Sequence, residues 1–126
     1  MTIAVQSKDD VAILLLSGKF LAGTAGPDLR QKVKDLPEAG VRQLIVDFGE
    51  VPYIDSTGLG FLAGARVSAQ HAGARIVLTG LNAHVRRILD NVNLRQFFEV
   101  GDDASAALVL LSQSEASTHE SGKSER

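Results

Sequence analysis

The sequence contains no cysteine and no tryptophan, and only 5% of its 126 residues are aromatic. The absence of cysteine excludes disulfide scaffolds, thiolate metal sites and thiol nucleophiles. Hydrophobic residues make up 44% of the chain, so with few aromatic side chains the core must be mainly aliphatic. A chain of this length buries roughly two-thirds of its unfolded surface, and we therefore expect one domain with an ordinary core.

The sequence also lacks an excess of charge and a long apolar run. Its 13 Lys and Arg residues are balanced by 15 Asp and Glu residues, for a net charge of -2, which predicts no direct binding to nucleic acid. The apolar run Val11–Leu16 is far too short to span a bilayer, so we expect no membrane insertion. The N-terminal residues do not have the pattern of a signal peptide. These absences predict a small cytoplasmic domain.

Four segments have the pattern of strands. Ile3 and Val5 alternate with polar residues, and a short turn separates them from the run Val11–Leu16, which predicts an antiparallel hairpin. In Leu44–Phe48 and Arg75–Thr79, apolar residues follow one another instead of alternating with polar ones. This pattern is typical of strands buried on both faces. We expect these later strands to be parallel, because a helical segment lies between them.

Helices are predicted between and after the strands. The segment from Pro27 to Leu36, closed by Pro37, and the segment Thr57–Ala72 have helical spacing. The later elements are a helix capped by Asn82, a short strand Phe97–Val100 and a final helix capped by Asp102-Asp103.

Together these elements predict an α/β fold, a mixed sheet of four to five strands with alternating helices packed against it. Residues 112–126 contain no aliphatic residue larger than Ala, so they cannot repay the entropy of ordering. We therefore expect a domain over residues 1–111 and a disordered tail over residues 112–126.

The segment Val51–Gly60 joins a predicted central strand to a helix and is the richest in functional signals. Asp55 and Ser56 are both good N-cap residues, because their side chains accept hydrogen bonds from the free amides of a first helical turn. Such helix starts after parallel strands often carry function in α/β proteins. The alternative is that this segment is only a well-made helix start.

A helical wheel divides the helix that follows into two faces. The face assigned to the core contains Phe61, Leu62, Ala65, Ala69 and Ala72. Leu59 and Ala63 fall on another face, where the wheel predicts an exposed apolar pair beside Ser56. Such a pair would form a small docking surface for a partner protein.

The segment Tyr53-Ile54-Asp55-Ser56-Thr57-Gly58-Leu59-Gly60, preceded by Leu44-Ile45-Val46-Asp47-Phe48, resembles the signature of STAS domains. The resemblance is closest to the stand-alone bacterial anti-sigma factor antagonists, and it covers roughly Ile3 to Leu111. It implies the STAS-like form of the α/β fold described above.

The resemblance also implies a protein-binding switch that is not an enzyme. In this family the serine matching Ser56 is phosphorylated by an anti-sigma factor that is itself a serine kinase. The unphosphorylated antagonist sequesters that kinase and releases the sigma factor, and a serine phosphatase reverses the modification. The protein would be the substrate and the ligand in this cycle, with no catalytic residue, cofactor or metal of its own.

The partner-binding surface is expected to surround Ser56. Family members commonly carry an acidic residue soon after the glycine that ends the second strand, but here Gly18 is followed by Lys19-Phe20-Leu21-Ala22-Gly23. Phe20 or Leu21 would then offer an apolar contact instead. The residues expected to contact the partner are Asp55, Thr57, Gly58, Leu59, Ala63, Phe20 and Leu21.

The sequence leaves two alternative functions open. Within the same fold, the chain could be a STAS subunit of another assembly, such as a stress-signalling scaffold or a lipid-transport complex. A small nucleotide-binding domain is disfavoured, because Gly58–Gly64 lacks both a dinucleotide fingerprint and a P-loop lysine. Asp47 is expected to have a capping or loop-bracing role. The separated His71, His84 and His119 suggest no metal site.

Overall fold

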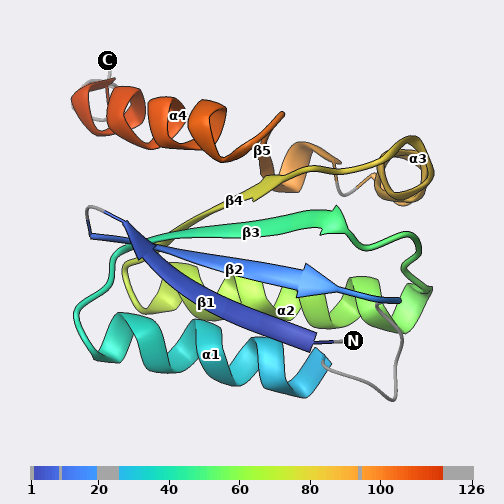
Figure 1. The fold of residues 1–126 in the computed structure, drawn as a ribbon, viewed down its shortest axis with the longest axis horizontal. Coiled ribbons are helices and arrows are strands. Elements are labelled where there is room, and N and C mark those ends of the chain that lie inside the picture. Colours follow the sequence, from blue (N-terminus) through green and yellow to red (C-terminus); the bar gives the residue numbers. More distant parts are fainter. Residues whose placement is uncertain (1, 9, 20–25, 94, 118–126) are drawn as a thin grey trace.

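The computed structural model describes residues 2–8, 10–19, 26–93 and 95–117, and these form one five-stranded mixed sheet with helices on both faces (Figure 1). The strands follow the sheet in chain order, with β1 antiparallel to β2 and the other neighbouring strands parallel. Their bounds are Thr2–Lys8 (β1), Val11–Ser17 (β2), Gln43–Glu50 (β3), Arg75–Thr79 (β4) and Glu99–Gly101 (β5). The predicted mixed sheet, including its hairpin, is confirmed.

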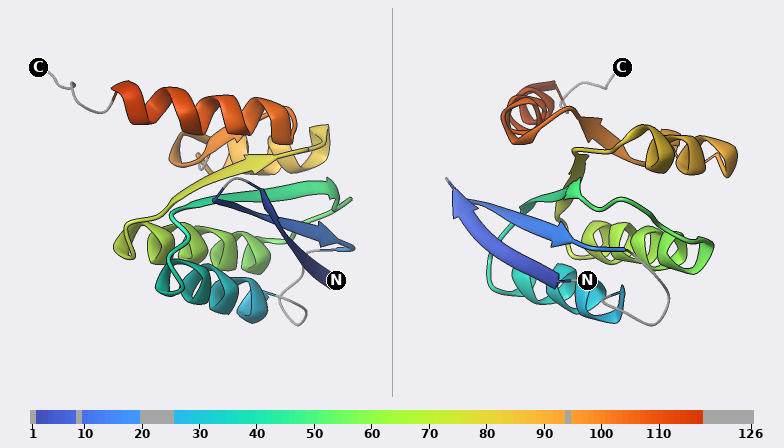
Figure 2. Two further views of the ribbon diagram at one scale, coloured as in Figure 1. Left: turned by 60° about the vertical axis from the view of Figure 1, so that its left-hand side comes forward. Right: turned by 45° about the vertical axis from the view of Figure 1, so that its right-hand side comes forward.

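Helices α1 (Gly26–Glu38) and α2 (Ser56–His71) lie side by side on one face of the sheet, and α4 (Ala104–Ser117) covers the other face (Figures 1 and 2). Helix α3 (Ala83–Asn91) follows β4 and contributes buried residues to the core beneath α1 and α2. None of the described helices is both long and apolar enough to cross a membrane. Since β2 and β3 end at one edge of the sheet, α1 and α2 both begin there.

Two buried clusters hold these layers together. Alternate residues of β2 divide between the clusters, because successive side chains of a strand point to opposite faces. The larger cluster lies under α1 and α2 and includes Leu14, Leu44, Leu78 and Phe48. The smaller cluster lies under α4 and contains Val11, Ile13, Ile45, Val77, Ala107 and Leu111.

Several element boundaries differ by a residue or two from the sequence-based prediction, and the differences in α1, β5 and α4 bear on the fold. Pro37 does not end helix α1. It lies in the last turn of the helix, which ends at Glu38. Strand β5 contains Glu99–Gly101, whereas Phe97 belongs to the short 3-10 helix η1 (Arg95–Phe97). Helix α4 continues through residues 112–117, where the predicted tail begins, and residues 118–126 lie outside the described part of the chain.

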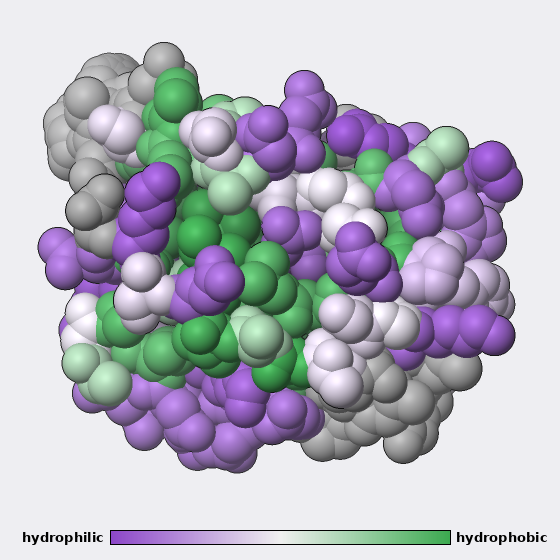
Figure 3. Space-filling view, viewed as in Figure 1, coloured by the Kyte–Doolittle hydropathy of each residue, from purple (hydrophilic) through white to green (hydrophobic). Residues whose placement is uncertain are grey.

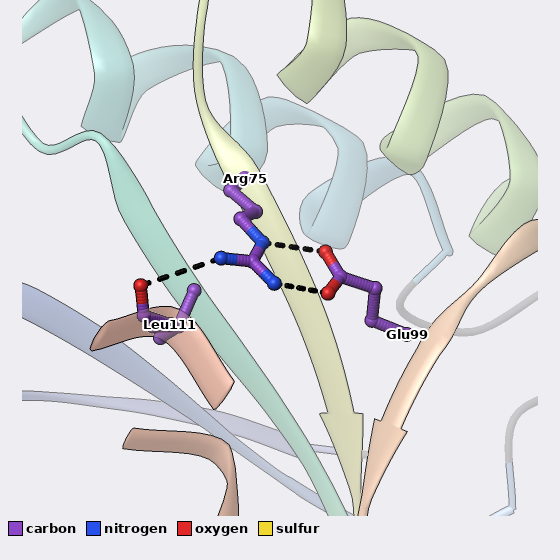
Figure 4. A network of polar contacts seen from close by, with 3 residues as sticks. All are labelled: Arg75, Glu99 and Leu111. Carbon is purple, nitrogen blue, oxygen red and sulfur yellow. Dashed lines mark hydrogen bonds and ion pairs between the residues drawn. The ribbon is translucent and has the colours of Figure 1, made fainter. Parts of the chain in front are cut away.

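A polar network joins β4, β5 and α4 at the edge of the sheet (Figure 4). The Arg75 guanidinium of β4 forms a two-point contact with the Glu99 carboxylate of β5. A third guanidinium N–H donates to the Leu111 carbonyl of α4, at 3.3 Å. Strand β5 is only three residues long, so it can form few backbone hydrogen bonds with β4. The side-chain bonds of this network add to that short backbone ladder.

The face seen in Figure 3 carries an apolar region around α4 and the adjoining strands, whereas the lower edge formed by α1 is hydrophilic. Val109 of α4 is 54% exposed, and Val5 of β1 is 44% exposed.

Candidate functional site

The candidate site lies where the connection from β3 enters α2. Val51 and Ile54 are 1% and 0% exposed, so the connection is anchored in the core on both sides of an exposed Pro52-Tyr53 pair. The chain therefore reaches the first residue of α2 from a fixed position. The Asp47 carboxylate accepts a hydrogen bond from the Gly49 amide at 2.7 Å, within the last residues of β3.

Asp55 is the N-cap of α2. Its backbone is extended, with φ -97° and ψ 176°, and its carboxylate accepts a hydrogen bond from the Gly58 amide at 2.7 Å. The Asp55 carbonyl also accepts the first bond of the helix, from the Leu59 amide at 2.9 Å. Of the two candidate caps, Asp55 therefore satisfies the free amide of the first turn.

Ser56 is the first residue of α2, and it is exposed. Among the described residues its hydroxyl has no hydrogen-bond partner, because the neighbouring carboxylate has taken the capping role. The site thus presents a free hydroxyl at the positive end of a 16-residue helix. A phosphate added there would lie at the helix N-terminus, where backbone amides and the helix dipole favour negative charge.

The other residues predicted around Ser56 take different positions. Thr57 is exposed, Asp55 and Ala63 are half-buried, and Gly58 is buried. Phe20 and Leu21 lie outside the described residues. Ser56 and Thr57 are thus the accessible part of the predicted surface at the helix start.

The prediction that Leu59 forms an exposed apolar pair with Ala63 is wrong. Leu59 is 4% exposed and belongs to the same buried cluster as Ile54, Val85 and Leu89. The wheel assumed that α2 has neighbours on one side only, but α2 packs against α1 and β4 and also contacts η1 through Arg66 and Phe97.

Arg66 forms the contact between α2 and η1. It lies seven residues after Leu59, and therefore on the same side of the helix. Its guanidinium stacks over the ring of Phe97 in η1, 4.1 Å from the ring centroid. The exposed positions of α2 are instead on the face of Ser56, where Gly60 is exposed and Val67 is 42% exposed.

The N-terminus of α3 holds the connection before Ser56 in place. Asn82 caps α3 as predicted, its side-chain oxygen accepting a hydrogen bond from the Val85 amide at 2.8 Å. The side-chain amide of the same residue donates to the Val51 and Pro52 carbonyls, at 3.2 and 3.4 Å. Sequence reasoning missed this second role, because it links positions that are about 30 residues apart.

Tyr53 and His84 form a second link between the same two segments. Their rings stack with centroids 5.0 Å apart and an interplanar angle of 21°. Within the described residues, no three His, Asp or Glu side chains are grouped in a way that could hold a metal ion. In this structure His84 thus packs against the connection before Ser56.

The sequence is similar to those of known proteins. The sequence model of the STAS domain matches residues 2–107. The anti-sigma-B factor antagonist of Listeria monocytogenes is 35% identical over 85 residues, which are 64% of this chain and 75% of that protein.

Solved structures show the same fold. An anti-sigma factor antagonist from Mycobacterium paratuberculosis superposes with a TM-score of 0.74 at 21% identity, covering 86% of this chain and 92% of that one. The Bacillus cell fate determinant SpoIIAA in its phosphorylated form has a TM-score of 0.65 at 16% identity, covering 86% of this chain and 99% of that one.

Proposed function

Because this chain belongs to the STAS domain family and is an anti-sigma factor antagonist, we propose that phosphorylation of Ser56 controls its binding to an anti-sigma factor. The unphosphorylated protein binds an anti-sigma factor that is also a serine kinase, and it thereby releases the sigma factor. Phosphorylation of Ser56 by the kinase ends the complex, and a serine phosphatase restores the binding form. The protein acts in the cytoplasm as substrate and ligand, without catalysing a reaction.

The single observation that carries the proposal is the exposed, unengaged hydroxyl of Ser56 beside the capping carboxylate of Asp55. A kinase can reach this hydroxyl without opening the fold. The cap does not depend on it, so its modification removes no hydrogen bond of the helix start. These two properties are what a reversible phosphorylation site requires.

The effect of the phosphate on binding follows from its charge. It adds about -1.5 to -2 charges at pH 7, next to the carboxylate of Asp55. The free protein tolerates this charge, because the phosphate stays in contact with water and lies at a helix N-terminus. In an interface the same charge must be desolvated, and about 3–4 kcal/mol of penalty already weakens binding by two to three orders of magnitude. The switch therefore needs no change of fold.

The test is phosphorylation by the purified serine-kinase anti-sigma factor of the same organism, with ATP. Mass spectrometry should find one phosphate on the wild type, on the peptide that contains Ser56. The Ser56→Ala variant should accept none, and the Thr57→Ala control should be modified like the wild type. A phosphate located on Thr57 or elsewhere would overturn the assignment.

A further inference from the structure

A shallow groove runs between α1 and α2 and begins at Thr57, the residue after Ser56. Two adjoining depressions form it, and both are lined by Arg30 of α1 and Phe61 of α2. The depression nearer the helix start also includes Thr57 and Gly60, and the farther one includes Gln31, Lys34 and Ser68. We refer to these seven residues as the α1–α2 groove.

The groove is open because α2 has glycines where side chains would fill it. A Cβ atom at Gly60 would meet nothing within 4 Å, and one at Gly64 would meet the side chain of Arg30, with Nε at 3.4 Å. Glycine inside a helix costs roughly 0.5–1 kcal/mol relative to alanine. Gly60 therefore weakens the helix while no described neighbour needs the space, and it lies one turn after Ser56 on the same face.

The groove is positively charged, although the chain as a whole has a net charge of -2. Arg30 and Lys34 lie one turn apart on α1, and both line the groove. Neither forms a hydrogen bond or an ion pair with another described residue, and no acidic residue is among those that line the groove. By contrast, Lys32 of the same helix pairs with Asp28 at 3.3 Å.

We propose that the α1–α2 groove binds an acidic segment of the anti-sigma factor, as a second contact beside Ser56. The carboxylates of that segment pair with Arg30 and Lys34, and its apolar side chains contact Phe61 across the bare surface at Gly60. This inference rests on the proposed function and names the chemistry of its partner. Charge complementarity and continuity with Ser56 through Thr57 and Gly60 identify the occupant.

An acidic occupant also strengthens the switch. A phosphate on Ser56 would stand beside the carboxylates of the bound segment, and like charges brought together in an interface cost several kcal/mol. The same phosphate would compete with those carboxylates for the cation of Arg30. Phosphorylation would then reject the partner by charge as well as by desolvation.

The first test reverses the charge of the groove in the full-length protein. Binding to the purified anti-sigma factor of the same organism is measured by titration calorimetry at two salt concentrations. The variant with both Arg30→Glu and Lys34→Glu should bind about 30-fold more weakly or worse, and with less dependence on salt than the wild type. The control Arg87→Glu makes the same kind of charge change on an exposed residue of α3, and it should bind like the wild type.

The second test fills the groove without changing its charge. Gly60→Leu should fold at least as stably as the wild type, because the site has open space and leucine favours a helix, yet bind at least about tenfold more weakly. If the charge variant and the filling variant both bind with wild-type affinity, the groove is not a binding site, and the role proposed for Ser56 is unaffected. Failure of the wild type to bind the anti-sigma factor would overturn the proposed function and the groove together.

Discussion

The carboxylate of Asp55 accepts a hydrogen bond from the amide of Gly58, three residues along the chain and 2.7 Å away. Because Asp55 caps the helix, the adjacent Ser56 is not needed for that role. Asp55 stabilises the start of α2, and Ser56 keeps a hydroxyl that the fold does not use. Stability and modification can therefore be changed separately at this site.

Replacing Asp55 by alanine should lower the free energy of unfolding by about 1 kcal/mol, because the cap of α2 is lost. Urea titration followed by circular dichroism measures this change. Ser56→Ala is the matched control, and it should stay within about 0.5 kcal/mol of the wild type. An equal loss in both variants would mean that the serine shares the capping role.

The Ser56→Asp variant should separate binding from folding. Its added carboxylate gains from the helix dipole by about 0.3–1 kcal/mol, and repulsion from Asp55 offsets part of that gain, so the melting temperature should hardly change. Binding to the anti-sigma factor should weaken by about 100-fold, equal to about 2.7 kcal/mol. Calorimetry of unfolding and of binding on the same sample checks both values. A strongly lowered melting temperature would show that Ser56 has a structural role.

The sheet could be predicted from the sequence because its strands carry their pattern locally. At the centres of β3 and β4 lie the aliphatic runs Leu44–Val46 and Ile76–Leu78, and the bounds predicted for β4, Arg75–Thr79, are those of the structure. Strand β5 is only three residues long and depends on the side-chain network of Arg75 with Glu99. The sequence places the start of this strand at Phe97, two residues too early, because no local pattern distinguishes η1 from the strand that follows it.

The site was predicted only in part, for a related physical reason. The cap and the hydroxyl at Asp55-Ser56 are local features, and the sequence indicated both. Leu59 is buried in a cluster that also contains residues much later in the chain, such as Val85 and Leu89 of α3. A wheel drawn for one helix contains no information on how many neighbours that helix has.

Leu59 should therefore behave as a core residue. Leu59→Ala should lower the free energy of unfolding by about 2–4 kcal/mol, because it removes buried methyl groups and leaves a cavity. Chemical denaturation measures this loss, and Val67→Ala on the exposed face of the same helix should cost less than about 1 kcal/mol. A small effect at Leu59 would show that the residue is not packed as described.

Asn82 offers a test of how the connection before Ser56 is held. Asn82→Asp keeps an oxygen that can cap α3, but it replaces the amide that donates to the Val51 and Pro52 carbonyls. Amide hydrogen exchange should become faster at residues 53–56, while α3 keeps its protection. The control Arg87→Ala, exposed on the same helix, should change neither. Loss of protection throughout α3 would mean that the substitution had damaged the cap instead.

Gly80 follows β4 and lies close to the backbone near the end of β3, so it should not accept a side chain. Its φ is +70°, and a Cβ atom would lie 2.8 Å from the backbone nitrogen of Gly49 and 3.0 Å from the carboxylate of Asp47. Gly80→Ala should therefore lower the free energy of unfolding by about 2 kcal/mol or more, from backbone strain and overlap together. Gly60→Ala is the matched control, and it should raise stability by about 0.5–1 kcal/mol, since its site is open and helical. Thermal unfolding of the two variants should shift in opposite directions, and a shift in the same direction would contradict the close approach at Gly80.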